Sequence, residues 1–285
     1  MNAPVYEIFA LHVASDPHRT VGTNFFFDAF PADGNMSMPQ DYFFWVIRGD
    51  GRCIVVDTCF TAKGARRRGR LMHAAPDVLI QELGMEPSGV TDLVMTHLHW
   101  DHAGALGVFP NAKVWIHAEE LSYCTGSAML HRQVSKIYEL EDIQNVLSLL
   151  FDGRVKVISA GEVEIFPGIL AVKLGGHTPG SQVLQVATER GPVVLASDAA
   201  HFWANYSRRS PFPILDNFPE TLRAFERIER LANGELHRVI PGHDPLVRSA
   251  FPPLRGHKRI SCLHEAPTID IGSAVAAQFA ATEAA

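Results

Sequence analysis

A dense group of metal-ligand side chains lies in the stretch VMTHLHWDHAGALG (94–107). Three histidines and an aspartate fall there within a few positions, namely His97, His99, Asp101 and His102. In an extended segment, residues two apart point the same way, so His97 and His99 can face one metal ion. Asp101 and His102 follow where a helix is expected to begin, and they can face a second ion. The stretch therefore predicts half of a two-metal site, against the alternative that some of the 14 histidines cluster by chance.

Further ligands are required, because neither pair completes a four- or five-coordinate site. Three polar residues stand at the ends of apolar strands: His177 in GGHTPGS, Asp198 after VVLAS and His243 in IPGHD. Strand ends are where loops build active sites on α/β scaffolds. A carboxylate directly after a buried strand is tolerated if it bridges two cations, so Asp198 is predicted to be a shared ligand.

The predicted ligands divide into two groups around that carboxylate. One ion is expected on His97, His99 and His177, the other on Asp101, His102 and His243, with Asp198 shared. Mixed nitrogen and oxygen donors suit zinc, although manganese, iron or cobalt would also accept them. A hydroxide bridging two such ions has its pKa lowered toward neutrality and can attack a carbonyl carbon. The residues therefore predict a dinuclear metal-dependent hydrolase.

Short segments rich in β-branched and aromatic residues must position these ligands. Nine are predicted to be strands: 42–48, 53–57, 93–96, 113–117, 155–159, 170–174, 181–187, 192–198 and 237–242. Helices are predicted at 76–84, at 131–150 and between Asn217 and Gly234, with Asn217 and Glu220 forming a capping box. Near-continuous apolar strands such as PVVLAS are typical of sheets covered on both faces. The predicted fold class is layered α/β (α+β).

The composition favours one domain over residues 1–285, with 47% hydrophobic residues and a net charge of −6. An N-terminal extension is expected over about 1–40, and the tail at about 265–285 is expected to be a loose helix or a disordered end. No long basic stripe is present, which argues against nucleic acid and anionic membranes as partners. The N-terminus has no signal-peptide pattern and no long apolar run occurs, so a cytoplasmic location is predicted. The four cysteines form no C-x-x-C pair and are predicted to be reduced.

These motifs resemble the metallo-β-lactamase superfamily and, within it, the bacterial N-acyl-homoserine lactonases. CIVVDTCF, THLHWDHAG, GGHTPGS, SDA and IPGHD follow the family order between Tyr42 and Pro253. The resemblance implies a four-layer αβ/βα sandwich with two metal ions in a shallow cleft at one edge of the paired sheets, and it suggests a homodimer. The segment TVGTNFFFDAFPADGNMSMPQDYFFW also resembles the N-terminal extension of lactonases. Hydroxyacylglutathione hydrolases generally start closer to their motifs, so a lactone is favoured over a thioester.

The resemblance also implies roles for individual residues. Similar lactonases commonly carry a substrate-contacting tyrosine three residues after the shared aspartate, where this chain has His201. Either His201 or Tyr206 is therefore expected to stabilise the oxyanion. Asp101 is expected to carry a proton to the leaving alkoxide, and Asp57 to orient a ligand imidazole. Four aromatic residues are expected to line the substrate pocket: Trp100, Trp203, Phe43 and Trp45.

Three functions compete on this sequence. The first is hydrolysis of an N-acyl-homoserine lactone or another small lactone. The second is di-metal hydrolysis of a thioester, an amide, a β-lactam or a phosphodiester. The third is a non-catalytic metal-binding protein, which is disfavoured because a site with no substrate has little need for seven converging ligands.

Overall fold

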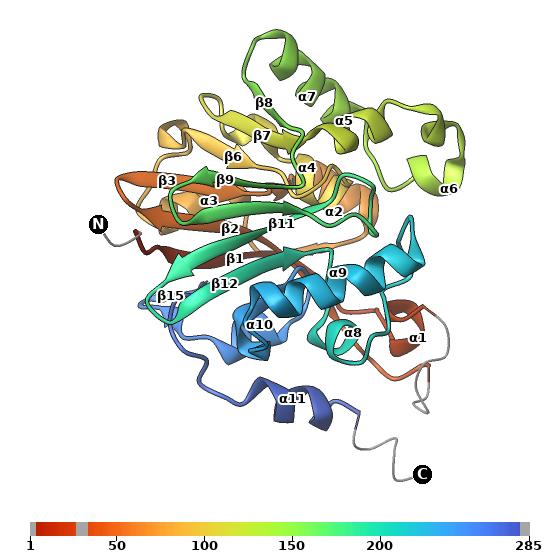
Figure 1. Cartoon of the computed structure of the whole chain (residues 1–285), viewed down its shortest axis with the longest axis vertical. Coiled ribbons are helices and arrows are strands. Elements are labelled where there is room, and N and C mark those ends of the chain that lie inside the picture. Colours follow the sequence, from red (N-terminus) through yellow and green to blue (C-terminus); the bar gives the residue numbers. More distant parts are fainter. Residues whose placement is uncertain (1–3, 27–33, 280–285) are drawn as a thin grey trace.

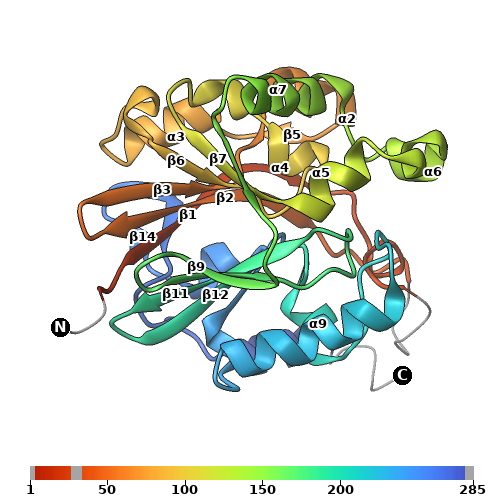
Figure 2. The same ribbon diagram turned by 45° about the horizontal axis from the view of Figure 1, so that its top comes forward.

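Two β-sheets packed face to face form the middle of the molecule, and helices cover the outer face of each (Figure 1). The computed structural model describes residues 4–26 and 34–279. Figure 2 shows the layers edge-on, in the order helices, sheet, sheet, helices. This arrangement confirms the four-layer αβ/βα sandwich that the resemblance implied.

The first sheet has nine strands within the described residues. Their order is β14 (Pro253–Leu254), β15 (His257–Cys262), β1 (Glu7–Asp16), β2 (Gln40–Gly49), β3 (Arg52–Val56), β6 (Asp92–Val94), β7 (Lys113–His117) and β8 (Val155–Ile158), with β5 (Leu71–Met72) paired to β1. The strands β3, β6, β7 and β8 are parallel. Because parallel strands end at one edge of a sheet, the turn after β3 and the loop after β6 lie side by side.

The second sheet has the order β13 (Val239–Pro241), β12 (Gly191–Ser197), β11 (Gln182–Thr188), β10 (Ile169–Lys173) and β9 (Glu162–Phe166). The strands β12 and β13 pair in parallel, with Ser197 opposite Pro241. The loops that follow them therefore leave the sheet at the same edge.

Most of the helices lie on the two outer faces (Figure 2). Against the first sheet lie α2 (Ala62–Arg68), α3 (Pro76–Glu82), α4 (Trp100–Ala103), α5 (Ala118–Cys124) and α7 (Leu140–Phe151), and α6 (Arg132–Ser135) projects to one side of this layer. The second sheet carries α9 (Phe218–Leu231). The remaining short elements are α1 (Val21–Asn24), β4 (Cys59–Phe60), α8 (Trp203–Ser207), α10 (Leu246–Ala250) and α11 (Ile271–Ala277).

The apolar core lies between the sheets and under each helical layer. Strand β12 is buried on both faces. Val193 and Leu195 pack between the sheets, whereas Val194 and Ala196 pack beneath α9. Alternate side chains of a strand point to opposite faces, so a continuous apolar run is required here. The prediction that such strands belong to sheets covered on both faces is confirmed.

The nine segments predicted to be strands each overlap a strand of the structure. Within the described residues, β1, β9, β15 and the two-residue strands β4, β5 and β14 were not predicted. Strand β1 lies between β15 and β2 and is buried over most of its length. Its nearly continuous apolar run lacks the alternation that marks a half-exposed strand, and periodicity alone does not distinguish such a run from a buried helical segment.

The helix predicted at 131–150 is broken into α6 and α7. Between them, the carbonyl of Ile137 accepts a hydrogen bond from the amide of Trp100, and the carbonyl of Lys136 accepts one from Arg68. These carbonyls are therefore not available to a continuous helix. The break turns Tyr138 inward, where its ring contacts His99 at a centroid distance of 4.8 Å.

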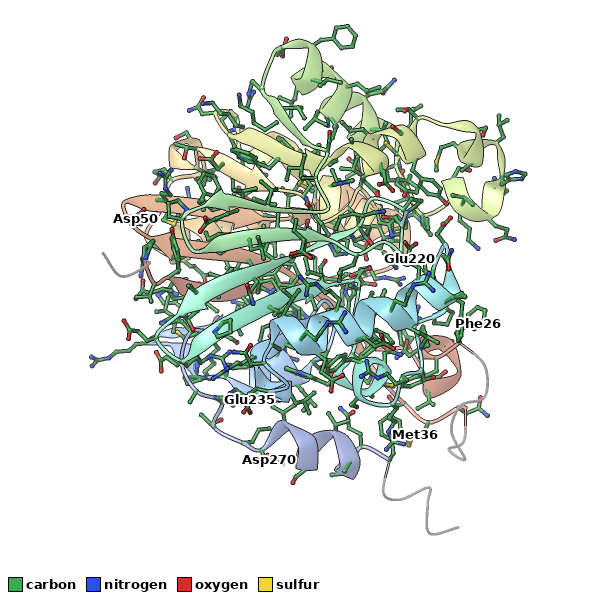
Figure 3. All side chains as sticks on the ribbon, in the orientation of Figure 1. Phe26, Met36, Asp50, Glu220, Glu235 and Asp270 are labelled. Atoms are coloured by element: carbon green, nitrogen blue, oxygen red, sulfur yellow. The ribbon has the colours of Figure 1, made fainter. Side chains whose placement is uncertain are left out.

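Helix α9 begins as predicted, with the side chain of Asn217 accepting a hydrogen bond from the amide of Glu220. The reciprocal half of the capping box is absent among the contacts of the described residues. The carboxylate of Glu220, labelled in Figure 3, instead accepts from the amide of Gly176 at 3.2 Å. The amide of Asn217 donates to the carbonyl of Gly176. Both contacts tie the start of α9 to the turn that carries His177.

Helix α11 lies within the predicted C-terminal tail, of which residues 280–285 fall outside the described part. Residues 1–3 and 27–33 of the predicted N-terminal extension also fall outside it. All four cysteines are free. Among the described helices, none has the length and apolar character needed to cross a membrane.

Candidate metal centre

The seven side chains predicted to be metal ligands converge where β6, β10, β12 and β13 end. Within the described residues, their donor atoms form clusters in which all atoms lie within 4.8 Å of one another. One cluster contains His97, His99, His177 and Asp198, and another contains Asp101, His102 and His243. All seven residues are buried.

Asp198 lies between the two clusters and presents one carboxylate oxygen to each. Its Oδ1 lies 3.1 Å from Nε2 of His102 and 2.9 Å from Nε2 of His243. Its Oδ2 lies 3.2 Å from Nε2 of His177 and 3.7 Å from Nε2 of His97. This is the geometry of a carboxylate shared by two neighbouring cation sites.

Hydrogen bonds at the outer nitrogens fix four of the ligand imidazoles. The Nδ1 atoms of His177 and His243 each lie 2.8 Å from a backbone carbonyl, of Ile214 and Asp41 respectively. The Nδ1 of His97 lies 3.1 Å from the Thr96 hydroxyl. A partner on Nδ1 leaves Nε2 to face the cluster, which is how metal-binding histidines are commonly oriented.

Asp57 fixes the fourth imidazole. Its Oδ2 lies 2.8 Å from Nδ1 of His102, and its two oxygens also accept hydrogen bonds from the amide and hydroxyl of Thr96. Asp57 has a positive φ of 57°, and Ser197, directly before the shared carboxylate, has one of 46°. Strained backbone of this kind concentrates at functional sites. The structure thus places Asp57 behind a ligand, as the sequence suggested.

Burial and charge set the protonation of the cluster. Burial lowers the pKa values of His97 and His99 well below the usual range, and neighbouring imidazoles lower them further, so both are neutral. Burial alone would lower the pKa of His102, but the carboxylates on either side raise it well above that range. Burial would raise the pKa of Asp198, but the surrounding imidazoles, that of His201 most strongly, hold it far below its usual value.

The donor atoms fit divalent cations. Among the buried side-chain atoms of the described residues, Nε2 of His102, Nε2 of His243 and Oδ1 of Asp198 have no hydrogen-bond partner although they face one another. Buried polar atoms of this kind are normally satisfied. A cation between them would satisfy all three and offset the cost of burying the carboxylate. The set of imidazoles and carboxylates suits zinc among the common metals.

His201 also joins the cluster. Its Nε2 lies 3.0 Å from Oδ2 of Asp198, and its ring stacks on Phe212 at a centroid distance of 3.8 Å and an interplanar angle of 5°. Burial lowers the pKa of His201 to about 3, so the imidazole is neutral and keeps one N–H. The guanidinium of Arg19 covers the ring of Phe212 at 4.9 Å.

Tyr206, the alternative to His201, lies elsewhere. It is buried beneath α9, where its ring contacts Phe225 at 6.0 Å and lies under the guanidinium of Arg209. Within the described part of the chain, no contact joins its ring to a ligand histidine. The expectation that Tyr206 reaches the site is therefore corrected.

The four aromatic residues expected to line the pocket are also placed differently. Trp203, Trp45 and Phe43 are part of the core between the sheets, and the indole of Trp203 donates to the carbonyl of Val239 at 2.8 Å. Trp100 packs on Phe60 in the core beneath α2 to α7. These residues lie near the ligand motifs in the sequence, but their side chains pack into the core. Core packing, rather than proximity in sequence, determines where the rings point.

The cavity beside the cluster has a volume of about 390 Å³ and is lined by His99 and His177. Its apolar wall consists of Val134, Ile137, Pro213, Ile214 and Leu215, and its rim of Tyr123, Gln133, Lys136, Thr178 and Asp216. The Tyr123 hydroxyl donates to Asp216 at 2.8 Å and joins α5 to the loop before α9. The sequence analysis missed these residues because they come from segments with no ligand motif.

Glu120 is a further residue that the sequence analysis missed. Its fully buried carboxylate accepts hydrogen bonds from the amide of Leu98 at 3.0 Å, the hydroxyl of Thr178 at 2.6 Å and the hydroxyl of Tyr138 at 3.3 Å. Leu98 lies between His97 and His99, and Thr178 follows His177. Glu120 therefore holds together the two loops that carry the first ligand cluster.

A family model of the metallo-beta-lactamase superfamily matches residues 40–243. Among curated proteins, an N-acyl homoserine lactonase of a Bacillus species is 31% identical over 167 residues, which covers 58% of this chain and 60% of that protein. The N-acyl homoserine lactonase AttM of Azorhizobium caulinodans is 25% identical over 190 residues, covering 62% of this chain and 67% of that protein. The chain thus aligns with about three fifths of the length of the Bacillus relative.

Solved structures share the fold. A quorum-quenching N-acyl homoserine lactone lactonase superposes with a TM-score of 0.71 at 22% identity, covering 90% of this chain and 100% of that one. AidC, a dizinc quorum-quenching lactonase in complex with the product N-hexanoyl-L-homoserine, superposes with a TM-score of 0.64 at 15% identity, covering 86% of this chain and 90% of that one.

Proposed function

Because this chain belongs to the metallo-beta-lactamase superfamily, we propose that it is a metal-dependent hydrolase that opens a lactone ring, either an N-acyl homoserine lactone or another small lactone. The observation that carries the proposal is the position of Asp198, whose two oxygens face two separate ligand clusters. The lactonase activity of the relatives named above supports the choice of substrate.

The residues that would hold two divalent ions are already oriented. His97, His99 and His177 would hold one ion, Asp101, His102 and His243 the other, and Asp198 would belong to both. We propose zinc as the native metal because the donors are imidazoles and carboxylates. When bound, such ions supply Lewis acidity toward a carbonyl oxygen and lower the pKa of water.

His201 is placed to stabilise the oxyanion. Its imidazole is neutral and retains an N–H, and stacking on Phe212 fixes the ring plane. A preorganised donor of this kind stabilises negative charge that develops on a carbonyl oxygen without reorganising during the reaction. His201 thereby takes the role of the tyrosine found at this position in similar lactonases.

Asp101 is placed to deliver the proton that ring opening requires. Hydrolysis of the ester bond by one water yields a carboxylate, an alcohol and one proton that is released to solvent. The other proton of the water must reach the departing ring oxygen. Asp101 is the most exposed of the seven ligand residues, and its oxygens lie 3.8 Å and 4.0 Å from the nearest imidazole nitrogens of His243 and His102. Its carboxylate is therefore held at the edge of the cluster, where a leaving group can reach it.

The cavity supports a lactone that carries an organic substituent. The apolar side chains of Val134, Ile137 and Leu215 line a volume of about 390 Å³ next to His99 and His177. Burying an apolar substituent there would contribute binding free energy while the ring lies at the cluster.

The test is hydrolysis of a lactone panel by purified protein of known metal content, followed by proton release in a pH-stat. A thioester and a β-lactam serve as competing substrate classes. We expect lactone turnover that a chelator abolishes and zinc restores. Turnover of the thioester or the β-lactam without lactone turnover would overturn the assignment of the substrate while leaving the metal centre intact.

A further inference from the structure

A second cluster of ligand-type side chains lies at the end of β15, in the sequence Cys262-Leu263-His264-Glu265. The donor atoms of Cys262, His264 and Glu265 all lie within 4.8 Å of one another. This cluster shares no residue with the metal centre described above, and the inference drawn from it does not rest on the proposed function.

The pairing of β1 with β15 brings a further carboxylate, that of Glu7, beside this group. Phe9 pairs with Cys262, and Glu7 lies two residues before Phe9 on the same face of β1. The ring of Phe9 supports that of His264 at a centroid distance of 5.2 Å. Arg48 of β2 pairs with Oε2 of Glu7 at 2.7 Å, which leaves Oε1 directed toward His264.

The imidazole of His264 is oriented as a ligand. Its Nδ1 lies 3.0 Å from the carbonyl oxygen and 3.1 Å from the amide nitrogen of Ile8, so backbone contacts on Nδ1 fix the ring. In the tautomer that donates to the carbonyl, Nε2 presents its lone pair. That Nε2 lies 4.0 Å from Oε1 of Glu7. A tetrahedral ion holds two such donors roughly 3.4 Å apart, so a small rotation of the Glu7 side chain would bring both atoms to one ion.

The thiol of Cys262 is buried, with 4% of the residue exposed, and among the described residues its sulfur has no hydrogen-bond partner. Burial, together with the nearby carboxylates of Glu265 and Glu7, raises the pKa of the thiol to about 11. Both carboxylates therefore lie close enough to the sulfur to affect it. A thiol in this state is inert toward solvent, but a metal ion can displace its proton.

We propose that Cys262, His264, Glu265 and Glu7 form an additional binding site for a zinc-like divalent cation. One sulfur, one nitrogen and two oxygen donors make up a four-ligand set typical of such ions. On binding, the S–H bond of Cys262 breaks, the proton passes to solvent and the sulfur donates its electron pair to the metal. The ion would join the start of β1 to the turn after β15 and would stabilise the folded state by mass action.

The site is remote from the catalytic centre. Asp41, at one end of β2, is hydrogen-bonded to His243, whereas Arg48, at the other end, pairs with Glu7. Seven residues of extended strand separate these two positions by roughly 23 Å. Occupancy can therefore be altered without touching the residues assigned to hydrolysis.

Cobalt(II) added to the metal-free protein tests the proposal, because a cobalt–thiolate bond gives a charge-transfer absorption in the near ultraviolet and the catalytic cluster contains no sulfur ligand. The test variants are Cys262→Ser and His264→Gln. The matched control is Cys53→Ser, which removes a free thiol outside the proposed site, in a residue that is partly buried. A thermal melt of each variant establishes that it folds.

We expect wild type and Cys53→Ser to develop the band at one equivalent beyond the cobalt that fills the catalytic cluster. Cys262→Ser should show no band, and His264→Gln should require at least tenfold more cobalt. Lactone turnover in the zinc-loaded variants should equal that of wild type. Absence of the band in wild type, its persistence in Cys262→Ser, or saturation only in large excess as an adventitious ion would each overturn the proposal.

Discussion

The Oδ2 of Asp57 lies 2.8 Å from the Nδ1 of His102, although 45 residues separate the two in the chain. This contact fixes the imidazole so that its Nε2 points at Oδ1 of the shared carboxylate of Asp198, 3.1 Å away. The parallel pairing of β3 with β6 brings the two residues together, because Asp57 follows one strand and His102 belongs to the helix after the other. A proposed metal ligand is thus oriented by a residue outside the proposed ligand set.

Asp57→Asn should weaken metal binding without unfolding the protein. The asparagine can present an amide N–H to Nδ1 of His102 and favour the wrong tautomer, and removal of such partners typically lowers metal affinity or activity by about 10–100-fold. Competition with a chromophoric chelator measures the affinity, and circular dichroism monitors the fold. An unchanged zinc affinity would show that Asp57 has only a structural role.

Glu120→Gln should lower both stability and metal affinity. The glutamine amide would face the hydroxyl or amide donors that now bond to the carboxylate, and each buried unsatisfied donor costs about 1–3 kcal/mol of unfolding free energy. Because those donors belong to Leu98 and Thr178, the first ligand cluster should loosen. Urea unfolding and zinc titration are the measurements. The matched control is Glu119→Gln, a neighbouring glutamate whose partner is Lys173 at the surface, and equal effects of the two substitutions would contradict the role of Glu120.

His201→Phe should lower kcat by about 100-fold with little change in zinc content. The phenyl ring preserves the stack on Phe212 but removes the N–H that is expected to stabilise the oxyanion. Phe212→Leu, which removes the stacking partner and keeps the imidazole, should have the smaller effect. The measurement is steady-state kinetics on the lactone that wild type hydrolyses fastest. An unchanged kcat in His201→Phe would show that His201 lines the site without taking part in the reaction.

The pH dependence of stability should carry a contribution from Asp244. Burial raises its pKa to about 7 in the folded protein, and its carboxylate accepts hydrogen bonds from the amides of Leu246 and Trp203. In the unfolded chain an aspartate ionises near its usual pKa of about 4. Between these values only the unfolded state loses the proton, so the unfolding free energy should fall as pH rises from about 4 to 7 and then level off.

Urea unfolding of the metal-free protein across that pH range provides the measurement, with Asp244→Asn as the comparison. The unfolding free energy of the wild type should fall relative to that of Asp244→Asn as pH rises from about 4 to 7, because only the wild type carries the titrating carboxyl. A difference independent of pH would show that Asp244 is ionised throughout.

The convergence of the proposed ligand residues could be predicted from sequence because each belongs to a local signal. His97, His99 and His102 lie within one short motif, and Asp198 and His243 end apolar strands whose role is visible from composition. The strands themselves were predictable for the same reason. Their arrangement in two sheets required the family resemblance, because strand order depends on contacts between distant segments.

The second layer of the site was not predictable in this way. Glu120 lies in an ordinary helical segment, and its function arises from contacts with loops at Leu98 and Thr178. The inward position of Tyr138 depends on a helix break that tertiary hydrogen bonds impose. Trp203 follows a ligand loop closely in sequence, yet core packing turns it toward Val239. Tertiary contacts, rather than local pattern, determine each of these outcomes.

The central claim is that Asp198 joins two metal sites into one hydrolytic centre. The most direct test measures zinc content and lactone turnover of Asp198→Asn beside Asp152→Asn, an exposed aspartate at the end of α7. We predict that Asp198→Asn keeps its far-ultraviolet circular dichroism but loses bound zinc and nearly all turnover, while Asp152→Asn matches wild type. An Asp198→Asn protein with full zinc content and full turnover would contradict the account.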